Sequence, residues 1–298
     1  MHIGLIGLGR MGGNMRTRMR NAGLTVVGYS RDPQVRDVDS LESLVAALPS
    51  PKVVWVMIPA GEPTRSTIAD LKELLGEGDL VVDGGNSKYT DDAVNAASLA
   101  EKGIGFVDCG VSGGVWGLQN GYALMYGGSA DDAAKVMPAF EALKPADTPD
   151  GLVHCGTTPG AGHFAKMVHN GIEYAMMQAY AEGWELLEKV DIVDNVPEIF
   201  ASWRTGTVVR SWLLDLFVDQ LRADEHLDGL RGYAEDSGEG RWTVEAAIEN
   251  AVPMPAISAS LFARFVSRQE DDVAMKAIAA MRAGFGGHSI QRSEPGTA

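Results

Sequence analysis

The sequence predicts an α/β domain with a mostly parallel sheet, followed by an all-helical domain. In the first half, short apolar runs alternate with amphipathic stretches, which is typical of βαβ units. The expected strands are residues 3–7, 24–29, 52–58, 80–83, 105–110, 122–128 and 152–156. The expected helices between them are residues 11–23, 40–48, 67–76 and 92–103.

The strand pattern ends at residue 156, and helical periodicity continues through most of the second half. The expected helices of this half are residues 162–190, 208–224, 243–251, 256–268 and 271–283. We therefore place a domain boundary near Thr158, between an α/β domain at 1–158 and a helical domain at 159–298.

Composition excludes several classes of function. The formal charge of -15 opposes binding to nucleic acid and to anionic membranes, which attract proteins rich in Lys and Arg. No apolar run approaches the roughly 18 residues of a membrane helix, and MHIGLIGLG lacks the pattern of a secretory signal. Two distant cysteines, Cys109 and Cys155, argue against a disulfide framework or a zinc site. We expect a soluble, cytoplasmic protein that binds a small ligand.

A glycine-rich loop, IGLIGLGRMG, lies between the first expected strand and the first expected helix. In this G-x-G-x-x-G pattern, Gly7 permits a tight turn, Gly9 lets the backbone approach a pyrophosphate and Gly12 allows close packing. The helix N-terminus adds amides that attract phosphate. A purely structural turn is the alternative, but the position after a strand favours a dinucleotide-binding Rossmann domain. The expected cofactor contacts are Gly7, Leu8, Gly9, Arg10, Met11 and Gly12.

The stretch GYSRDP, at the end of the second expected strand, bears on cofactor choice. Ser30 stands where NAD enzymes tend to carry an Asp, and Arg31 could stack on adenine and pair with a 2′-phosphate. Asp32 would repel that phosphate. We expect NAD(P)+ as the cofactor and favour NADP+, with NAD+ left open.

Two polar loops follow later strands, at the end of the sheet where open α/β folds bind ligands. DGGNS contributes Asn86, and DCGVSGGVWGLQNG contributes Ser112, Gly113 and Gly114. The second loop has more glycines than one turn needs, which indicates a backbone that comes close to a ligand. Loops capped by Asn and Ser are the alternative interpretation.

The stretch KMVHNGIEY carries a polar stripe on an expected helix. The residues of the stripe recur at i, i+3, i+4 and i+7 and are Lys166, His169, Asn170 and Glu173. The neighbouring positions, which are apolar enough to face a core, are Val168, Ile172, Ala175 and Met176. A solvated polar face is the alternative. A lysine kept from bulk water has a lowered pKa, so Lys166 could act as a general base.

Together these motifs resemble the 6-phosphogluconate dehydrogenase family in its short form, which belongs to the β-hydroxyacid dehydrogenases. GLGRMGGNM is similar to the family's cofactor loop and DGGNS to its second signature. CGVSGGVWGLQNGYALMYGG is similar to its substrate loop, and GHFAKMVHNGIEYAMMQAYAE to its catalytic helix. The resemblance covers essentially the whole chain, although most members are longer and carry a duplicated helical domain.

The resemblance implies oxidative decarboxylation of 6-phosphogluconate to ribulose 5-phosphate, with reduction of NAD(P)+ and without a metal, in the pentose phosphate pathway. Lys166 would be the base and acid at the 3-hydroxyl, and Glu173 the acid that protonates the enediol. The residues that would hold the sugar acid and the nicotinamide are Asn86, Ser112, Gly113, Gly114, His169 and Asn170.

The resemblance also implies a substrate phosphate site at Tyr174, Arg264, Arg282 and His288. The last two would come from the C-terminal tail of a partner subunit, so the expected assembly is a homodimer or homotetramer. Ser237 and Glu239 depart from the family, whose longer members carry Lys and Thr there. A carboxylate beside a phosphate is repulsive unless it is turned away or bridged.

Two other functions are compatible with these motifs. One is an NAD(P)-dependent dehydrogenase of another β-hydroxyacid, such as 3-hydroxyisobutyrate, which would not need Glu173 or the phosphate residues. The other is a non-enzymatic dinucleotide-sensing protein on a dehydrogenase fold. Such a sensor would be expected to keep the glycine loop but lose Lys166 and Glu173, both of which are present.

Overall fold

The computed structural model describes residues 1–146, 148–286, 289 and 291. The chain divides into two compact units, Met1–Gly171 and Ile172–Ala298. This division falls inside helix α7 (Ala161–Glu188), whose first turns belong to the first unit. The boundary that we place near Thr158 lies just before this helix and stays a prediction.

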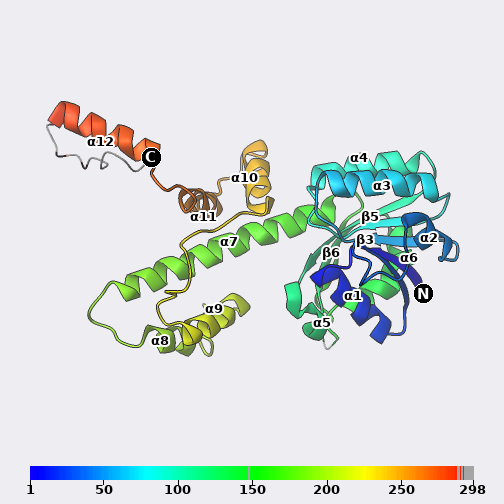
Figure 1. The fold of residues 1–298 in the computed structure, drawn as a ribbon, viewed down its shortest axis with the longest axis horizontal. Helices are drawn as coiled ribbons and strands as arrows, with labels where there is room; N and C mark the ends of the chain where they lie inside the picture. The colour runs from blue at the N-terminus through cyan, green and yellow to red at the C-terminus, as the bar shows by residue number, and fades with distance from the viewer. Residues whose placement is uncertain (147, 287–288, 290, 292–298) are drawn as a thin grey trace. The chain divides into compact units, whose positions relative to one another are not determined.

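A seven-stranded sheet forms the centre of the first unit, in the order β2-β1-β3-β4-β5-β6-β7 (Figure 1). Its strands are β1 His2–Ile6, β2 Thr25–Tyr29, β3 Val53–Val56, β4 Leu80–Asp83, β5 Gly105–Ser112, β6 Ala123–Gly128 and β7 Leu152–Gly156. All neighbours pair in parallel except β5 and β6, which are antiparallel. The mostly parallel sheet predicted from the sequence is confirmed.

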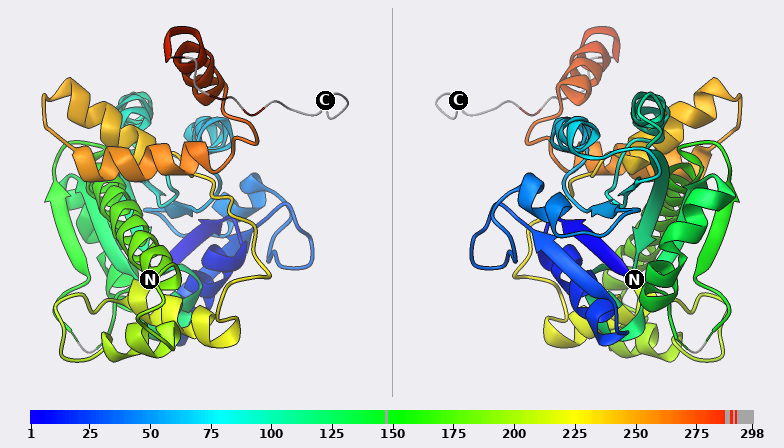
Figure 2. Two further views of the ribbon diagram at one scale, coloured as in Figure 1. Left: turned by 90° about the vertical axis from the view of Figure 1, so that its left-hand side faces the viewer. Right: turned by 90° about the vertical axis from the view of Figure 1, so that its right-hand side faces the viewer.

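Helices cover both faces of this sheet (Figures 1 and 2). They are α1 Arg10–Asn21, α2 Leu41–Ala46, α3 Glu62–Leu74, α4 Tyr89–Ala100, α5 Gly117–Asn120 and α6 Ala130–Leu143, with a short 3-10 helix at Gly114–Trp116. Trp55 of β3 packs in the apolar layer of α1 and α6, whereas Val54 and Val56 pack in the layer of α2 and α3. Because both faces are buried, the strands are continuous apolar runs in the sequence.

The described residues of the second unit contain helices and no strand. After α7 these helices are α8 Val196–Ser202, α9 Trp212–Ala223, α10 Glu239–Glu249, α11 Pro255–Val266 and α12 Val273–Gly286. Phe200 of α8 and Leu214 and Val218 of α9 form a core against which Trp184 of α7 packs. The predicted all-helical domain is confirmed. Among the described residues, no helix has both the length and the apolar character to cross a bilayer.

Candidate active site

The glycine-rich loop connects β1 to α1 at the position where the sheet order reverses, between β1 and β3. Gly7 has φ of +94°, which L residues rarely adopt, and a Cβ on Gly12 would lie 1.9 Å from the Gly7 carbonyl oxygen. A Cβ on Gly9 would meet no atom within 4 Å. The fold therefore requires Gly7 and Gly12, whereas Gly9 leaves open space beside the N-terminus of α1. The remaining loop residues of the prediction are Leu8, which is buried, Met11, which is half-buried, and Arg10, which is exposed.

The polar residues after β2 form a surface turn. The Asp32 carboxylate accepts the backbone N–H of Gln34 at 2.9 Å, and the Asp32 N–H donates to Ser30 Oγ at 3.3 Å. Arg31 is exposed in this turn. Asp32 therefore stabilises the turn itself, which gives its carboxylate a role apart from any ligand.

Lys166 is only 7% exposed, although it is a lysine on a helix. Its Nζ donates to Asn170 Oδ1, and His169 Nδ1 donates to the same oxygen at 3.0 Å. Gly110 of β5 lies beside it, because a Cβ there would be 2.2 Å from the Lys166 Cβ. The structure thus brings three residues of the predicted stripe together through Asn170 Oδ1, with Lys166 and Asn170 buried and His169 exposed.

The apolar positions beside this stripe do not form the core that we expected for them. Ile172 is 51% exposed, and Val168, Ala175 and Met176 are only half-buried. The expectation is wrong for Ile172 because the polar side of α7 packs on the sheet, at a strand that presents glycine instead of an apolar side chain.

The two predicted substrate loops follow neighbouring strands. Asp83 of β4 lies in register with Asp108 of β5, so both loops leave the same end of the sheet. Asp83 shapes the first loop, since its carboxylate accepts the N–H of Gly85 at 3.0 Å and the hydroxyl of Ser87 at 2.7 Å. The predicted contact in this loop, Asn86, is exposed.

The second loop begins with Ser112, the last residue of β5. Gly113 and Gly114 have φ values of +135° and +53°, a backbone conformation that glycine adopts readily and that would be strained in other residues. Gly110 lies beside Lys166, whereas Gly113 packs near Tyr122 and a Cβ on Gly114 would meet no atom within 4 Å.

A buried ionisable cluster lies under these loops and was not predicted. Asp83, Asp92 and Asp108 are 0% exposed and His163 is 2% exposed. Burial opposes a charge on His163, but the nearby carboxylates outweigh burial and raise its pKa to about 9. Burial raises the pKa of Asp92 to about 7, against the opposite effect of His163. The sequence signal was a carboxylate inside the apolar strand GFVDCG.

Three members of this cluster, Asp83, Asp92 and His163, have potential metal-ligand atoms within 4.8 Å of one another. Hydrogen bonds inside the fold already use both oxygens of Asp83, and a 2.7 Å bond joins Asp92 Oδ2 to His163 Nδ1. Among the described residues, Asp92 Oδ1 and His163 Nε2 have no hydrogen-bond partner, whereas the other ligand atoms of these three residues are already bonded within the fold. We therefore describe the arrangement as a hydrogen-bonded cluster.

The second unit contains a compact group of predicted phosphate residues. The guanidinium carbon of Arg264 lies 3.4 Å from the ring centroid of Tyr174, which is buried. The backbone N–H of Ser237 donates to the Tyr174 hydroxyl at 3.1 Å, and the Oγ of Ser237 donates to Glu239 Oε2 at 2.5 Å. Glu239 is 2% exposed, so its carboxylate is turned into the protein.

The remaining predicted residues have less defined surroundings. Glu173 is half-buried on α7, about two turns after Lys166. Arg282 is exposed on α12. His288 lies outside the described residues.

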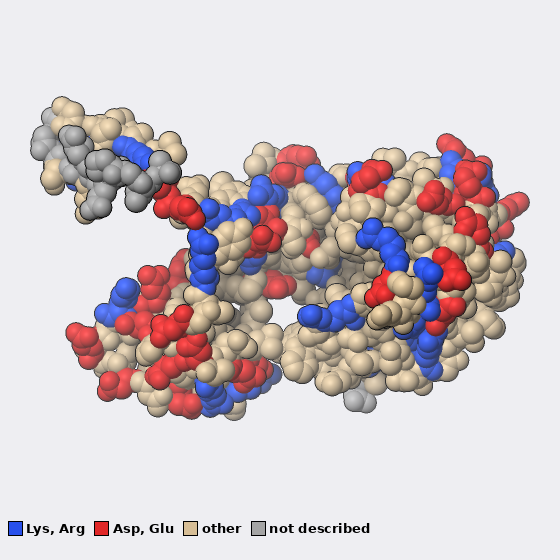
Figure 3. Space-filling model, in the orientation of Figure 1, with Lys and Arg blue, Asp and Glu red and all other residues tan. Residues whose placement is uncertain are grey.

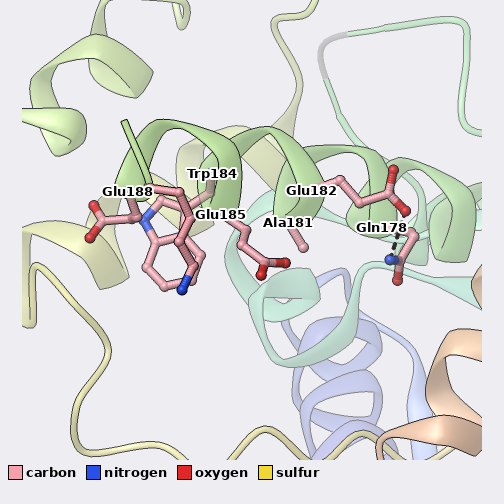
Figure 4. A pocket seen from close by; sticks show the side chains of 7 residues that line it. Gln178, Ala181, Glu182, Trp184, Glu185 and Glu188 are labelled. Carbon is pink, nitrogen blue, oxygen red and sulfur yellow. Dashed lines mark hydrogen bonds between the residues drawn. The ribbon is translucent and has the colours of Figure 1, made fainter. Parts of the chain in front are cut away.

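A hollow of about 380 Å³ lies along the C-terminal half of α7 (Figure 4). Its lining residues are Gln178, Ala181, Glu182, Trp184, Glu185, Glu188 and Lys189. None of the predicted site residues is among them, and three glutamates oppose an anionic ligand. This hollow is therefore a poor site for a sugar-acid phosphate.

Acidic side chains gather over α8 and α9 on the face shown in Figure 3. The chain has 40 Asp and Glu residues against 25 Lys and Arg residues. Part of this acidic surface is paired, as Asp215 is with Arg204 and Glu198 with Arg222. Such a surface opposes a nucleic acid backbone and agrees with a small-molecule ligand.

Comparison with known proteins agrees with this geometry. The NAD binding domain of 6-phosphogluconate dehydrogenase matches residues 2–148, and the 6-phosphogluconate dehydrogenase C-terminal domain matches residues 162–294. A Haloferax volcanii protein named 6-phosphogluconate dehydrogenase, NAD(+)-dependent, decarboxylating, is 38% identical over 304 residues. That match covers 99% of this chain and 100% of the relative.

Solved structures of two enzymes resemble this chain. Plasmodium falciparum 6-phosphogluconate dehydrogenase, solved in its apo form, with NADP+ and with 6-phosphogluconate, matches with a TM-score of 0.83 and 27% identity. The match covers 100% of this chain and 67% of that one. Mycobacterium tuberculosis 3-hydroxyisobutyrate dehydrogenase shares the fold, with a TM-score of 0.71, 23% identity and coverage of 95% and 99%. The chain therefore belongs to the 6-phosphogluconate dehydrogenase family.

Proposed function

We propose that this protein oxidises 6-phosphogluconate at C3 and releases its carboxyl group as CO2, which yields ribulose 5-phosphate and reduced NAD(P). The observation that best supports this activity is the placement of Lys166. This amine is buried, is bonded to Asn170 and lies against Gly110, at the end of the sheet from which both substrate loops leave. An amine held there can take a proton from a hydroxyl and return it.

The side chains of α7 account for the proton transfers. Lys166 takes the proton of the 3-hydroxyl as C3 loses a hydride, and the bound dinucleotide supplies the hydride acceptor. The C1–C2 bond of the 3-keto acid then breaks, its electron pair forms the enediol, and Lys166 returns the proton to the 3-oxygen. Glu173 protonates the carbon that has lost CO2, while the enediol hydroxyl gives its proton back to Lys166. His169, Asn170, Asn86 and Ser112 hold the sugar acid.

The residues of the first unit fit a dinucleotide. The space beside Gly9 and the N-terminus of α1, which has no side-chain cap, suit a pyrophosphate. Ser30 and Arg31 follow β2, where the adenosine ribose is expected. The family accepts either cofactor, since the Haloferax volcanii relative is named NAD(+)-dependent and the Plasmodium falciparum enzyme was solved with NADP+. For this chain we propose NADP+ before NAD+.

Ser30→Asp tests this preference. A carboxylate at this position accepts a bond from a 2′-hydroxyl and repels a 2′-phosphate, so the NAD+ to NADP+ ratio of kcat/KM should rise by at least about tenfold. Ser66→Asp, which places the same charge on an exposed serine of α3, should leave the ratio unchanged. An unchanged ratio in the Ser30 variant would show that Ser30 does not contact the 2′ position of the adenosine ribose.

We propose that Tyr174 and Arg264 bind the substrate phosphate, joined by Arg282 and His288 from a second copy of the chain. The Glu239 carboxylate would repel the substrate phosphate. Because it is buried and accepts a hydrogen bond from Ser237, we expect this repulsion to be reduced. Exposed apolar side chains on α7, namely Phe164, Ile172 and Leu186, support a homodimer or homotetramer in a cytoplasmic enzyme.

The direct test is an assay with 6-phosphogluconate and each of NAD+ and NADP+, in which trapped CO2 and NAD(P)H absorbance are measured together. The expected result is equal amounts of both products. Faster oxidation of 3-hydroxyisobutyrate, or oxidation of 6-phosphogluconate without release of CO2, would indicate that the natural substrate is another β-hydroxyacid. Cofactor binding without turnover of either acid would support a sensor.

A further inference from the structure

Backbone N–H groups at the start of α7 donate to a buried carboxylate that has no part in the proposed mechanism. Asp108 of β5 accepts the N–H of Gly160 on Oδ1 and the N–H of His163 on Oδ2, both at 2.8 Å. Both donors lie at the start of α7, where backbone N–H groups have no partner within the helix. Asp108 therefore caps the helix from a strand of the sheet, and its negative charge suits the helix N-terminus.

A second bond ties the same turn to another helix. His163 Nδ1 and Asp92 Oδ2 of α4 are 2.7 Å apart, and both side chains are buried. Together, Asp92, Asp108 and His163 form what we call the anchor cluster. It fixes the start of α7 to both a strand and a neighbouring helix.

Glycines let α7 approach the sheet closely at the anchor cluster. A Cβ on Gly162 would lie 2.4 Å from the Met125 carbonyl oxygen of β6, and a Cβ on Gly127 would lie 2.5 Å from Asp108 Oδ1. A larger side chain at position 162 would require a shift of the backbone, and one at position 127 would displace the Asp108 carboxylate. The first turns of α7 therefore have one position relative to β5 and β6.

Lys166 follows His163 by three residues and lies on the same side of α7. We propose that Asp108, assisted by Asp92 and His163, is a positioning residue for Lys166. By fixing the height and rotation of the first turns of α7, the anchor cluster holds Nζ at the distance from the 3-hydroxyl that proton transfer requires. This inference rests on the proposed role of Lys166. A misplacement of about 1 Å can lower a rate by roughly 100-fold.

The test compares two buried aspartates of the same unit. Asp79 is 4% exposed and accepts the N–H groups of Lys52 and Gly76 at 2.7 and 3.0 Å, at a turn that does not include α7. Asn replaces one acceptor oxygen by an amide donor in either place, so Asp108→Asn and Asp79→Asn both lose stability. Only Asp108→Asn should lower kcat, by at least about tenfold, with the KM values for acid and cofactor changed less than about threefold. Equal kcat values in the two variants would overturn the inference.

Amide hydrogen exchange supplies a readout that does not depend on activity. Exchange in residues 164–170 should be at least about tenfold faster in Asp108→Asn than in wild type, and unchanged in Asp79→Asn. Unchanged exchange in both variants would overturn the role of the anchor cluster, whether or not the protein is active. Inactivity of the wild type on 6-phosphogluconate would instead refute the proposed function. If Asp108→Asn does not fold, His163→Gln takes its place in both comparisons with the same expected results.

Discussion

At the scale of single residues, the pair of His163 and Asp92 links protonation to stability. The pKa of His163 rises from 6.5 to about 9, so between these values the native state keeps a proton that the unfolded state releases. Its contribution is complete below pH 6.5 and is lost as pH rises towards 9. The pKa of Asp92 rises from 3.8 to about 7, which acts in the same direction over a lower range.

We therefore predict that the thermal midpoint of the wild type falls between pH 6.5 and pH 9. The double variant Asp92→Asn with His163→Gln keeps a neutral pair and should show a smaller fall. His226→Gln removes an exposed histidine that pairs with Glu188, and it should keep the wild-type slope because exposed pairs contribute little. Scanning calorimetry at four pH values measures all three slopes. Parallel slopes for wild type and double variant would contradict the assigned pKa shifts.

The grouping of Lys166, His169 and Asn170 could be predicted because i, i+3 and i+4 spacing places residues on one helix face. Which face is buried could not be predicted, since periodicity ranks apolar residues as buried and Ile172 is exposed. The reason lies in Gly110, which is distant in sequence and lets the stem of Lys166 pack on β5. Asp108 was missed for a similar reason, because its partners are backbone groups of α7.

At the scale of elements, the strands were the most predictable part. Their apolar runs are short and are separated by turn glycines, so all seven were expected close to their observed bounds. Three helices, α5, α6 and α8, were missed. Helix α6 contains Pro138, which usually ends a helix, although Ser129 caps it by accepting the Asp132 N–H at 3.1 Å. Helices α5 and α8 are too short for helical periodicity to be detected.

The turn between β1 and α1 separates two roles of glycine. In Gly9→Ala the added Cβ meets no protein atom and φ is −65°, so Tm should change little. The KM for the dinucleotide should rise by at least about tenfold, because the methyl group occupies the space of the pyrophosphate. In Gly12→Ala the Cβ would lie 1.9 Å from the Gly7 oxygen, so Tm should fall more strongly. If Gly9→Ala loses stability while its cofactor KM is unchanged, the loop has a structural role alone.

At the scale of the whole molecule, α7 takes part in both units and in the proposed assembly. Its first turns carry the predicted base, and its later turns pack with α8 and α9. Leu186, a large apolar side chain, is 65% exposed on this helix. The family resemblance implies a second copy of the chain, and we propose that its contact with α7 includes Leu186.

We predict that Leu186→Asp lowers the molar mass measured by light scattering to that of a single 31.7 kDa chain. An unpaired carboxylate inside an interface is costly, so the assembly should dissociate. Ile192→Asp introduces the same charge at a side chain that is 89% exposed after the end of α7, and it should keep the wild-type mass. A wild-type protein that is already monomeric would refute the proposed assembly.

We propose that Lys166 transfers the protons of an oxidative decarboxylation. Its most direct test is the rate of CO2 release from 6-phosphogluconate with NADP+ and with NAD+, in wild type, Lys166→Met and Lys189→Met. The last variant removes an exposed lysine just after α7 and should keep the wild-type rate. Lys166→Met should lose roughly 10²–10⁴-fold in kcat while it still binds the dinucleotide. CO2 release at the wild-type rate from Lys166→Met would show that Lys166 is not the base.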